Sequence, residues 1–432
     1  MIVIETELLF RAGPFRRPTF LNAVQELERQ PKSPRPSGPG IHGWTRACAN
    51  SARQDGCETA YGWSGVVAGQ GSTDLLIYWR RGERPFPHGL NEYRTEPRPG
   101  AVTFRAMTRV FSGIQPSGEL HLGNLLGAIR HWAVMQHETD AVFCVVDLHA
   151  LTLPKPPGEV GRESLRLSQL LMASGLDPEV CILFVQSHVR EHTECAWLMQ
   201  CNVSFGELSR MVQFKDKSGQ HEFISGSLFT YPALQAADIL LYDTNEVPVG
   251  EDQRQHIEIT RDIAERFNGR FGETFVLPEA VIPPAGARVM DLQNPTNKMS
   301  KSLDSAKGTV NVLDDPKRVA KKIRSAVTDN DGEVRFDFSE KPGVSNLLSI
   351  LAAATGGDPA SLADDYDQYG QLKVDAADAV VALLEPIQAR FAELEADPAE
   401  TARLLKVGAD KAREIAATTL TRAKENIGLL AD

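Results

Sequence analysis

The chain is poor in cysteine, in long apolar runs and in net positive charge. Its six cysteines show no CxxC or CxxH spacing, so the sequence predicts neither a zinc site nor a disulfide framework. No apolar run reaches the roughly 20 residues of a membrane-spanning helix. The N-terminus lacks the basic-then-apolar order of a signal peptide. We therefore expect a cytoplasmic protein without a membrane partner.

Acidic residues outnumber basic ones, which gives a net charge of −11. The surface as a whole will not attract a polyanion, so DNA is not an expected partner and any RNA contact must be local. One candidate is the segment 314–324. Read as a helix, it places Lys317, Lys321 and Arg324 on one face and Val319 and Ile323 on another. A solvated helix face is the alternative interpretation.

Residues 1–106 differ in composition from the rest of the 432-residue chain. Thirteen arginines but one lysine precede Met107, and residues 31–40 contain four prolines and two glycines. Such a composition is typical of a linker. We expect this part to be disordered. Either translation starts at Met107, or the segment is a true extension that contacts RNA through its arginines.

After Met107, apolar strands alternate with amphipathic helices. The strands are predicted at Val110–Ile114, Ala141–Asp147, Val180–Gln186 and Glu246–Val249, and the helices from Leu125 to about Gln136, at Arg162–Ser174 and at Gln255–Phe267. This alternation predicts a Rossmann-like doubly wound parallel α/β sheet. After about Leu303 the strand signals stop, and a C-terminal α-helical domain is predicted from Ala376–Leu394 and Ala399–Leu430.

Two lysines flank a serine in the polar loop Asn297–Ser302, with the sequence NKMSKS. Lysine is a compact, mobile point charge, so a closing loop can place two such charges where negative charge builds up on a departing pyrophosphate. Alone, such a string is more often a solvated loop.

A second motif, Gln115–Asn124 (QPSGELHLGN), links the first predicted strand to the first predicted helix. A helix N-terminus after such a turn offers backbone N–H groups to an anion. Gly123 would let the backbone approach a nucleotide, and Gly118 would relax the turn. His121 and Asn124 add side-chain donors. For this segment alone, an ordinary capped turn is the alternative.

HLGN together with KMSKS resembles the ATP site of class I aminoacyl-tRNA synthetases. The wider strings resemble the tryptophanyl-tRNA synthetase family: Phe111–Asn124, Met211–Ser218 (MVQFKDKS), Tyr231–Tyr242 (YPALQAADILLY) and Val249–Thr260 (VGEDQRQHIEIT). The resemblance covers about residues 107–432. It implies a catalytic domain over 107–303, a helical anticodon-binding domain over 304–432, L-tryptophan and tRNA(Trp) as partners, and a homodimer.

Tyr231, Gln235 and Asp238 are spaced to share one polar face of an otherwise apolar helix, and Pro232 suits the first turn of that helix. An indole N–H is only a donor, so a pocket that selects tryptophan needs a fixed acceptor. Asp238 supplies one, and leaving it unpaired would disfavour phenylalanine. A salt-bridged surface aspartate is the alternative. Many relatives have Met where Gln235 stands.

The resemblance also implies roles for individual residues. Gln115 would bridge ATP and tryptophan, and Val289 would present its backbone to adenine. The expected catalytic residues are Lys298, Lys301, Lys217, His121 and Asn124. The expected ATP-binding set adds Gln115, Pro116, Ser117, Gly123, Gly250, Glu251, Asp252, Val289, Met299, Ser300 and Ser302. The expected tryptophan-binding residues are Asp238, Tyr231, Gln253, Phe111 and Gln213. Mg²⁺ would be held by the phosphates of ATP rather than by a protein site.

The implied reaction has two steps. The carboxylate of tryptophan attacks the α-phosphate of Mg·ATP, and the acyl group then passes from the adenylate to a ribose hydroxyl of the terminal adenosine of the tRNA. Two alternatives are a tyrosine-specific synthetase and a non-catalytic RNA-binding paralogue. The strings AADILLY and GEDQ argue against the first, and the intact HLGN and KMSKS motifs argue against the second.

Overall fold

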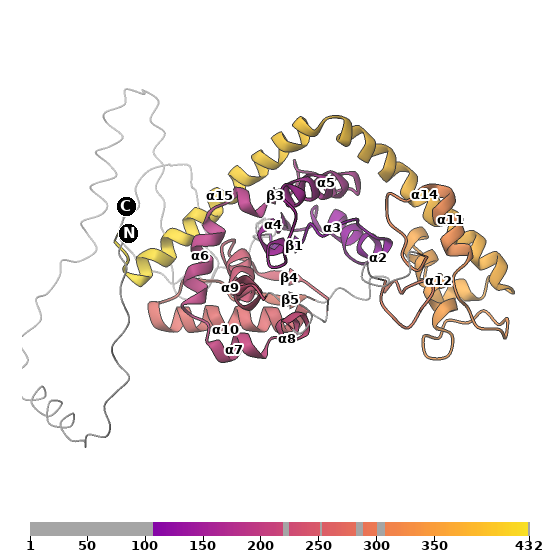
Figure 1. Ribbon diagram of the computed structural model, residues 1–432, viewed down its shortest axis with the longest axis horizontal. Helices are drawn as coiled ribbons and strands as arrows, with labels where there is room; N and C mark the ends of the chain where they lie inside the picture. Colours follow the sequence, from indigo (N-terminus) through magenta and orange to yellow (C-terminus); the bar gives the residue numbers. More distant parts are fainter. Residues whose placement is uncertain (1–106, 219–223, 251–252, 282–287, 300–306, 431–432) are drawn as a thin grey trace, which may run out of the picture. The chain divides into compact units, whose positions relative to one another are not determined.

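The computed structural model describes residues 107–218, 224–250, 253–281, 288–299 and 307–430. Within these ranges five strands form one sheet, and helices cover both of its faces (Figure 1). The predictions made for residues 1–106 lie outside the described residues.

All pairings in the sheet are parallel, and the strand order is β3-β2-β1-β4-β5. The strands are β1 (Arg109–Ile114), β2 (Asp140–Val145), β3 (Ile182–Val185), β4 (Glu246–Pro248) and β5 (Glu279–Val281). The predicted doubly wound parallel sheet is confirmed. The short edge strand β5 was not predicted, because three residues carry too little periodic signal.

In the described ranges, the helices that precede β5 in the sequence are α2 (Leu122–Asn124), the π-helix η3 (Leu125–Ile129), α3 (Arg130–Met135), α4 (Asp147–Ala150), α5 (Glu159–Ala173), the 3₁₀ turn η4 (Gln186–His188), α6 (Glu191–Gln200), α7 (Phe205–Arg210), α8 (Val212–Ser218), α9 (Gly226–Leu240) and α10 (Arg254–Phe271). Those after it are α11 (Pro316–Arg324), α12 (Pro342–Thr355), α13 (Pro359–Ala363), α14 (Tyr369–Ala396) and α15 (Pro398–Ile427).

Two helices begin earlier than predicted. The helix expected from Leu125 begins at Leu122, because His121 caps it. The helix that carries Asp238 begins at Gly226, where the Ser225 side chain accepts a hydrogen bond from the Ser227 N–H at 3.1 Å. Pro232 therefore lies inside α9 rather than in its first turn. It tolerates that position at the cost of one backbone hydrogen bond.

Successive strand residues point to opposite faces, and each face has its own apolar core. Val110 of β1 and Phe143 of β2 belong to one core, whereas Phe111 and Val142 belong to the other. The first core is completed mainly by α2, η3, α3, α5, α11, α12 and α14, and the second by α6, α9, α10 and α15. Because β2 and β3 are buried on both faces, their sequences are nearly continuous apolar runs.

The C-terminal helices share both cores with the sheet. Helices α11 and α12 pack against α14, which contacts α5, while α15 packs on β3 and α6 (Figure 1). The described residues all fall in one compact unit, Val102–Asp432. The boundary predicted at residue 303 lies outside the described residues, so the division into catalytic and anticodon-binding domains stays a prediction.

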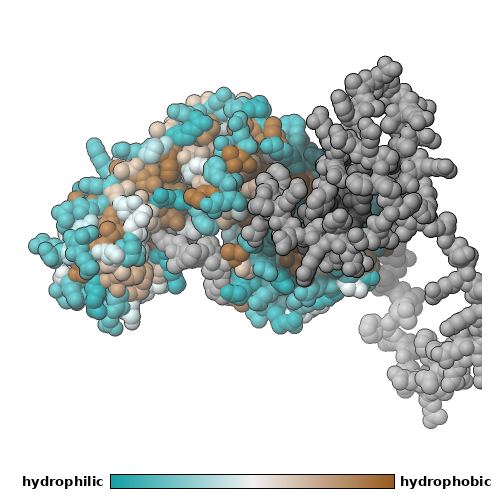
Figure 2. Space-filling model, turned by 180° about the vertical axis from the view of Figure 1, so that it is seen from behind, coloured by the Kyte–Doolittle hydropathy of each residue, from teal (hydrophilic) through white to brown (hydrophobic). Residues whose placement is uncertain are grey.

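No helix in the described ranges is both long enough and apolar enough to cross a membrane. On the face shown in Figure 2, hydrophilic residues make up much of the described surface, with hydrophobic residues in smaller areas between them.

Helix α15 lies directly on the backbone of β3. A Cβ added to Gly408 would overlap the carbonyl oxygen of Leu183, so only glycine allows this approach. The contact covers β3, the strand at the edge of the sheet. Covering an edge strand removes a site at which other chains could pair.

We expect Gly408→Ala to lower the free energy of unfolding by about 1–3 kcal/mol, because the added methyl overpacks the contact between α15 and β3. Gly161→Ala is the matched control, since a Cβ at Gly161 in α5 meets nothing within 4 Å. That variant should be neutral or more stable by up to about 1 kcal/mol. Urea unfolding of both variants checks this, and equal behaviour of the two would contradict the proposed contact.

Candidate active site

The pairing between β1 and β4 stops almost where it begins. The two strands share one register pair, Val110 with Glu246. Pro248, two residues further along β4, lies on the same edge and has no N–H with which to continue the ladder. This is also the point where the strand order reverses, the place where open parallel sheets bind ligands beyond the carboxyl ends of their strands.

A cavity of about 360 Å³ opens at this point. Strands β1 and β4 both contribute to its wall, and α9 and the segment after β2 complete it. All five predicted tryptophan-binding residues line it, as do Gln115 and Gly250; the lining residues are Phe111, Ser112, Gly113, Gln115, Trp132, Val146, His149, Thr152, Gln213, Leu228, Tyr231, Gln235, Asp238, Ile239, Val247, Pro248, Val249, Gly250 and Gln253. The polar face predicted for α9 therefore points into a cavity.

A second cavity, of about 420 Å³, lies next to the HLGN motif. It is lined by Ile114, Gln115, Ser117, Gly118, Leu120, His121, Asn124 and Leu167. Gln115 lines both cavities, and its Nε2 donates to the backbone oxygen of His149 at 3.2 Å. Its position between the cavities agrees with the bridging role expected of it.

The HLGN motif caps its own helix. The Asn124 N–H donates to His121 Nδ1, and the His121 N–H donates to Asn124 Oδ1, both at 3.3 Å. Because Nδ1 accepts, a neutral His121 carries its proton on Nε2 and remains a donor. Thus the capped turn and the donor role are compatible. Gly118 has φ of 73°, which confirms that the turn requires glycine there.

Gly123 also makes room within the cap. A Cβ on Gly123 would lie 3.0 Å from Nδ1 of His121. The close approach of this backbone to a nucleotide stays a prediction.

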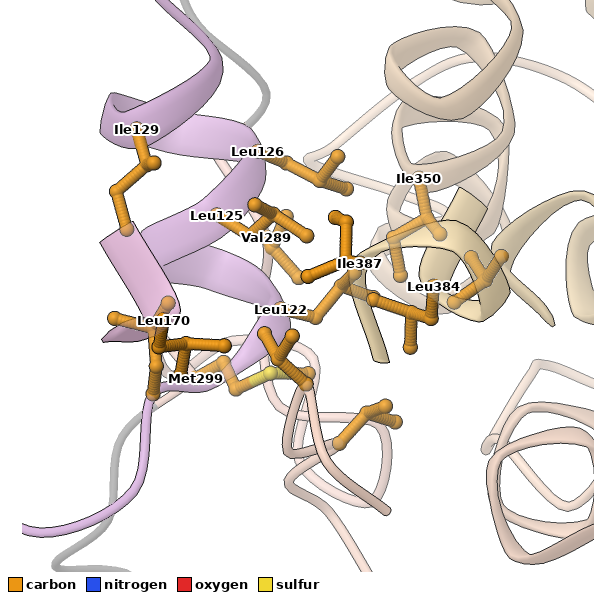
Figure 3. Packing of buried hydrophobic residues seen from close by; sticks show 14 of the residues in the cluster. Leu122, Leu125, Leu126, Ile129, Leu170, Val289, Met299, Ile350, Leu384 and Ile387 are labelled. Carbon is orange, nitrogen blue, oxygen red and sulfur yellow. The ribbon is translucent and has the colours of Figure 1, made fainter. Parts of the chain in front are cut away.

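The KMSKS segment packs against the helix that follows HLGN. Met299 is buried in the same apolar cluster as Leu122 and Val289 (Figure 3). Its N–H donates to the Val289 oxygen at 3.1 Å, and the Leu122 N–H donates to the Val310 oxygen at 2.8 Å. Two motifs far apart in the sequence are thereby brought side by side.

Some predicted residues have no described place in the site. Lys298 is exposed beside the buried Met299. Pro116 and Val289 are buried and line neither cavity, and the Val289 carbonyl already accepts the Met299 N–H. Lys217 lies in α8, but its side chain is outside the described part. Glu251, Asp252, Ser300, Lys301 and Ser302 also lie outside it.

Asp238 is the most buried charged group at the first cavity, with 1% of its surface exposed. Its Oδ1 accepts from Gln186 Nε2 and from His192 Nδ1, both at 2.6 Å, and its Oδ2 lies 2.8 Å from His149 Nε2. The sequence predicted that Asp238 supplies a fixed acceptor. Three protein donors hold this carboxylate in place before any ligand binds.

Two opposed effects act on the pKa of Asp238. Burial alone would raise this pKa, but the hydrogen bonds from His149 and His192 outweigh burial and hold it well below its usual range. The group is therefore an ionised carboxylate near neutral pH. In that state it accepts hydrogen bonds and cannot donate them.

Sequence reasoning missed the donors that hold Asp238. His149 follows the end of β2, and Gln186 follows the end of β3. Polar residues at the carboxyl ends of adjacent buried strands converge on one edge of the sheet, and this signal could have identified both. His192 lies in α6 and gives no comparable signal.

We expect Asp238→Asn to lower the free energy of unfolding by about 3–5 kcal/mol at pH 7, because an amide cannot accept from all three donors. An aspartate with a lowered folded pKa contributes stability above its unfolded pKa of about 3.9, and this contribution is lost as pH falls through the folded value. The difference in the free energy of unfolding between wild type and variant should therefore be constant from pH 7 to about 5 and should narrow below about 4. Urea unfolding at several pH values measures it.

Asp367→Asn, at an exposed position, is the control and should leave the free energy of unfolding unchanged at each pH. A gap that widens on acidification would contradict the assigned ionisation of Asp238.

Comparison with known proteins identifies the family. The family model for class I tRNA synthetases (W and Y) matches residues 105–392. Tryptophan–tRNA ligase 1 of Streptomyces coelicolor is 53% identical over 329 residues, which cover 75% of this chain and 98% of that protein. The tryptophan–tRNA ligase of Caldanaerobacter subterraneus is 52% identical over 326 residues, covering 75% and 99%.

Solved structures agree with the sequence matches. The tryptophanyl-tRNA synthetase of Mycoplasma pneumoniae superposes with a TM-score of 0.71 at 36% identity, covering 75% of this chain and 98% of that one. The enzyme of Campylobacter jejuni, solved with ADP and tryptophan, gives 0.65 at 34% identity, covering 74% and 100%. A tyrosyl-tRNA synthetase of Archaeoglobus fulgidus, at 21% identity, shares the fold. The chain therefore belongs to the class I aminoacyl-tRNA synthetases, within the tryptophanyl-tRNA synthetase family.

Proposed function

We propose that the chain is a tryptophan–tRNA ligase, which activates L-tryptophan with ATP and transfers it to the 3′-terminal adenosine of tRNA(Trp). The observation that carries this proposal is the buried, ionised Asp238 in the wall of the cavity between β1 and β4. The relatives named as tryptophan–tRNA ligases, at 52–53% identity, support it. They do not support a tyrosine-specific enzyme or a non-catalytic paralogue.

The first cavity suits an amino acid with a flat apolar side chain and one donor. Phe111 and Ile239 provide apolar walls, and Asp238 provides the acceptor for the indole N–H. Tyr231 and Gln253 are the proposed partners of the amino acid's ammonium group. The Tyr231 hydroxyl is fixed 2.7 Å from His256 Nε2, and burial raises the Tyr231 pKa, so this phenol stays neutral.

The second cavity is the proposed site of the phosphates. His121 and Asn124 would donate to them, while Lys298, Lys301 and Lys217 would neutralise the charge that develops on pyrophosphate. Mg²⁺ would arrive on ATP and neutralise phosphate charge, held by phosphate oxygens, since Gln115, Ser117 and Asn124 are the cavity's side-chain oxygen donors.

Gln115 lies where the two ligands would meet, and so would align the tryptophan carboxylate with the α-phosphate for in-line attack. No protein nucleophile is required in this scheme. Positioning of the two reactants and stabilisation of the charge on the phosphates accelerate the reaction.

Two surfaces are proposed for partners. Trp197, Phe205, Val212 and Ile224 are large apolar residues exposed around α6–α9, and we assign this area to a homodimer interface. On α11, Lys317, Lys321 and Arg324 are exposed as predicted, while Lys322 is buried and bonds Asp314 at 2.7 Å and the Thr309 oxygen at 2.6 Å. The exposed face is the proposed RNA contact, and a cytoplasmic location follows from the function.

Amino-acid-dependent exchange of label between pyrophosphate and ATP tests the function on the full chain. We expect exchange with tryptophan and little with tyrosine or phenylalanine, because only the indole presents a single N–H to the acceptor. Exchange with tyrosine would overturn the assignment of Asp238, and no exchange by folded protein with any of the three would favour the non-catalytic paralogue.

Lys301→Ala should lower the rate of tryptophan activation by roughly two to three orders of magnitude, because one charge on the leaving pyrophosphate loses its partner. Tryptophan binding should be nearly intact. Lys307→Ala, an exposed lysine in the same region, is the control and should keep the wild-type rate. Single-turnover formation of the adenylate gives the rates, and equal rates for both variants would remove Lys301 from the mechanism.

A further inference from the structure

The carboxylate of Asp238 is approached from two sides. Oδ1 accepts from Gln186 and His192, and two donors fill the lone pairs of one carboxylate oxygen. Oδ2 accepts from His149 alone and so keeps one lone pair. Asp238 and His149 line the first cavity, whereas Gln186 and His192 do not. The remaining acceptor position therefore belongs to the oxygen that serves the cavity.

The proton positions on His192 follow from its two partners. Its Nδ1 lies 2.6 Å from Oδ1 of the ionised Asp238, so Nδ1 must carry a proton and donate. Its Nε2 lies 2.8 Å from the Tyr242 hydroxyl. In the neutral ring Nε2 accepts, and the phenol donates to it. The result is a directed chain from Tyr242 through His192 to Asp238.

The first two residues of this hydrogen-bond chain, Tyr242 and His192, are held rigidly by their surroundings. Tyr242 and His192 are each 0% exposed. The Tyr242 ring stacks on Phe111 with centroids 5.5 Å apart and planes within 10°, and Phe111 is itself a wall of the cavity. Phe184 packs on both rings, with centroids 5.7 Å from His192 and 5.8 Å from Tyr242. The position of the carboxylate and the position of the proposed indole wall thus depend on the same tyrosine.

We infer that Tyr242 and His192 are positioning residues for tryptophan selection, which orient Asp238 so that the free lone pair of Oδ2 meets the indole N–H. This inference rests on the proposed function. The ionised Asp238 sets the proton on Nδ1 of His192, the Tyr242 hydroxyl holds the imidazole ring through Nε2, and the ring in turn holds the carboxylate. Neither residue touches the substrate.

The experiment compares tryptophan with 3-benzothienylalanine, in which sulfur replaces the indole N–H and the shape is kept. The ratio of kcat/KM for the two in pyrophosphate exchange isolates the bond from the N–H to Oδ2. We expect Tyr242→Phe to lower this ratio by about tenfold, mostly through a higher KM for tryptophan. The variant loses the hydrogen bond to His192 Nε2 that helps to orient Asp238, and a tenfold change corresponds to about one hydrogen bond. The values for the analogue should change little.

Tyr369→Phe is the matched control. Its hydroxyl also makes hydrogen bonds, a half-buried one with Lys341 at 3.1 Å and an exposed one with Asp331 at 2.9 Å, but it lies in α14 and lines neither cavity. This variant should lose stability and keep the wild-type ratio. If it does, a loss of stability alone cannot explain a lower ratio of kcat/KM values in Tyr242→Phe.

Two substitutions of His192 separate its two bonds. In His192→Asn the amide nitrogen falls near the place of Nδ1 and can still donate to Asp238. In His192→Gln the amide nitrogen falls near the place of Nε2, and the donor to Asp238 is lost. We expect His192→Asn to keep more of the tryptophan preference than His192→Gln.

The outcomes are distinct. If wild-type chain shows no exchange with tryptophan, the proposed function fails, whatever the variants do. If the wild-type protein does show exchange with tryptophan, two results would overturn the inference. One is a ratio of kcat/KM values in Tyr242→Phe within twofold of wild type, and the other is a His192→Gln variant that selects tryptophan as well as His192→Asn. Either result would mean that the hydrogen bonds from Tyr242 through His192 to Asp238 are only structural. Should Tyr242→Phe fail to fold, the two His192 variants decide.

Discussion

The break in pairing between β1 and β4 is the constraint on which the site depends. Phe111 of β1 and Val247 of β4 both line the first cavity, beyond the single register pair that joins the two strands. Pro248 enforces the break through a missing N–H, and the reversed strand order sends the connections after β1 and β4 in different directions. The first cavity opens at this interruption, and Gln115, in the turn after β1, lines both it and the second cavity beside HLGN.

A buried carboxylate in that cavity needs compensation, since an uncompensated buried charge is costly. Asp238 obtains it from one glutamine and two histidines, each on a different segment of the chain. Each of these three side chains gives the carboxylate one hydrogen bond, two to Oδ1 and one to Oδ2. The same donors that stabilise the fold therefore set the direction from which the proposed indole N–H would be accepted.

Local patterns in the sequence were sufficient for strands β1 to β4, for the turn at Gly118 and for the polar face of α9, because each depends on spacing within one element. The partners of Asp238 depend on tertiary packing. His192 comes from α6, whose apolar and polar residues show no clear helical stripe, so nothing local marks it. The close contact between Gly123 and the His121 ring was not predicted for the same reason: the ring belongs to a cap, and the cap depends on the fold. Pro232 misled the prediction, because its local preference for a first turn was overridden by burial of α9.

The methionine of the KMSKS segment shows how distant parts of the chain are joined. Met299 lies in one apolar cluster with Leu122 of the HLGN helix and with Ile350 and Leu384 of the C-terminal helices (Figure 3). Helix α11, whose exposed face is the proposed RNA contact, adds Val319 and Ile323 to the same cluster. The proposed RNA-contact helix and Met299, the neighbour of a lysine proposed to stabilise pyrophosphate, therefore share one close-packed core.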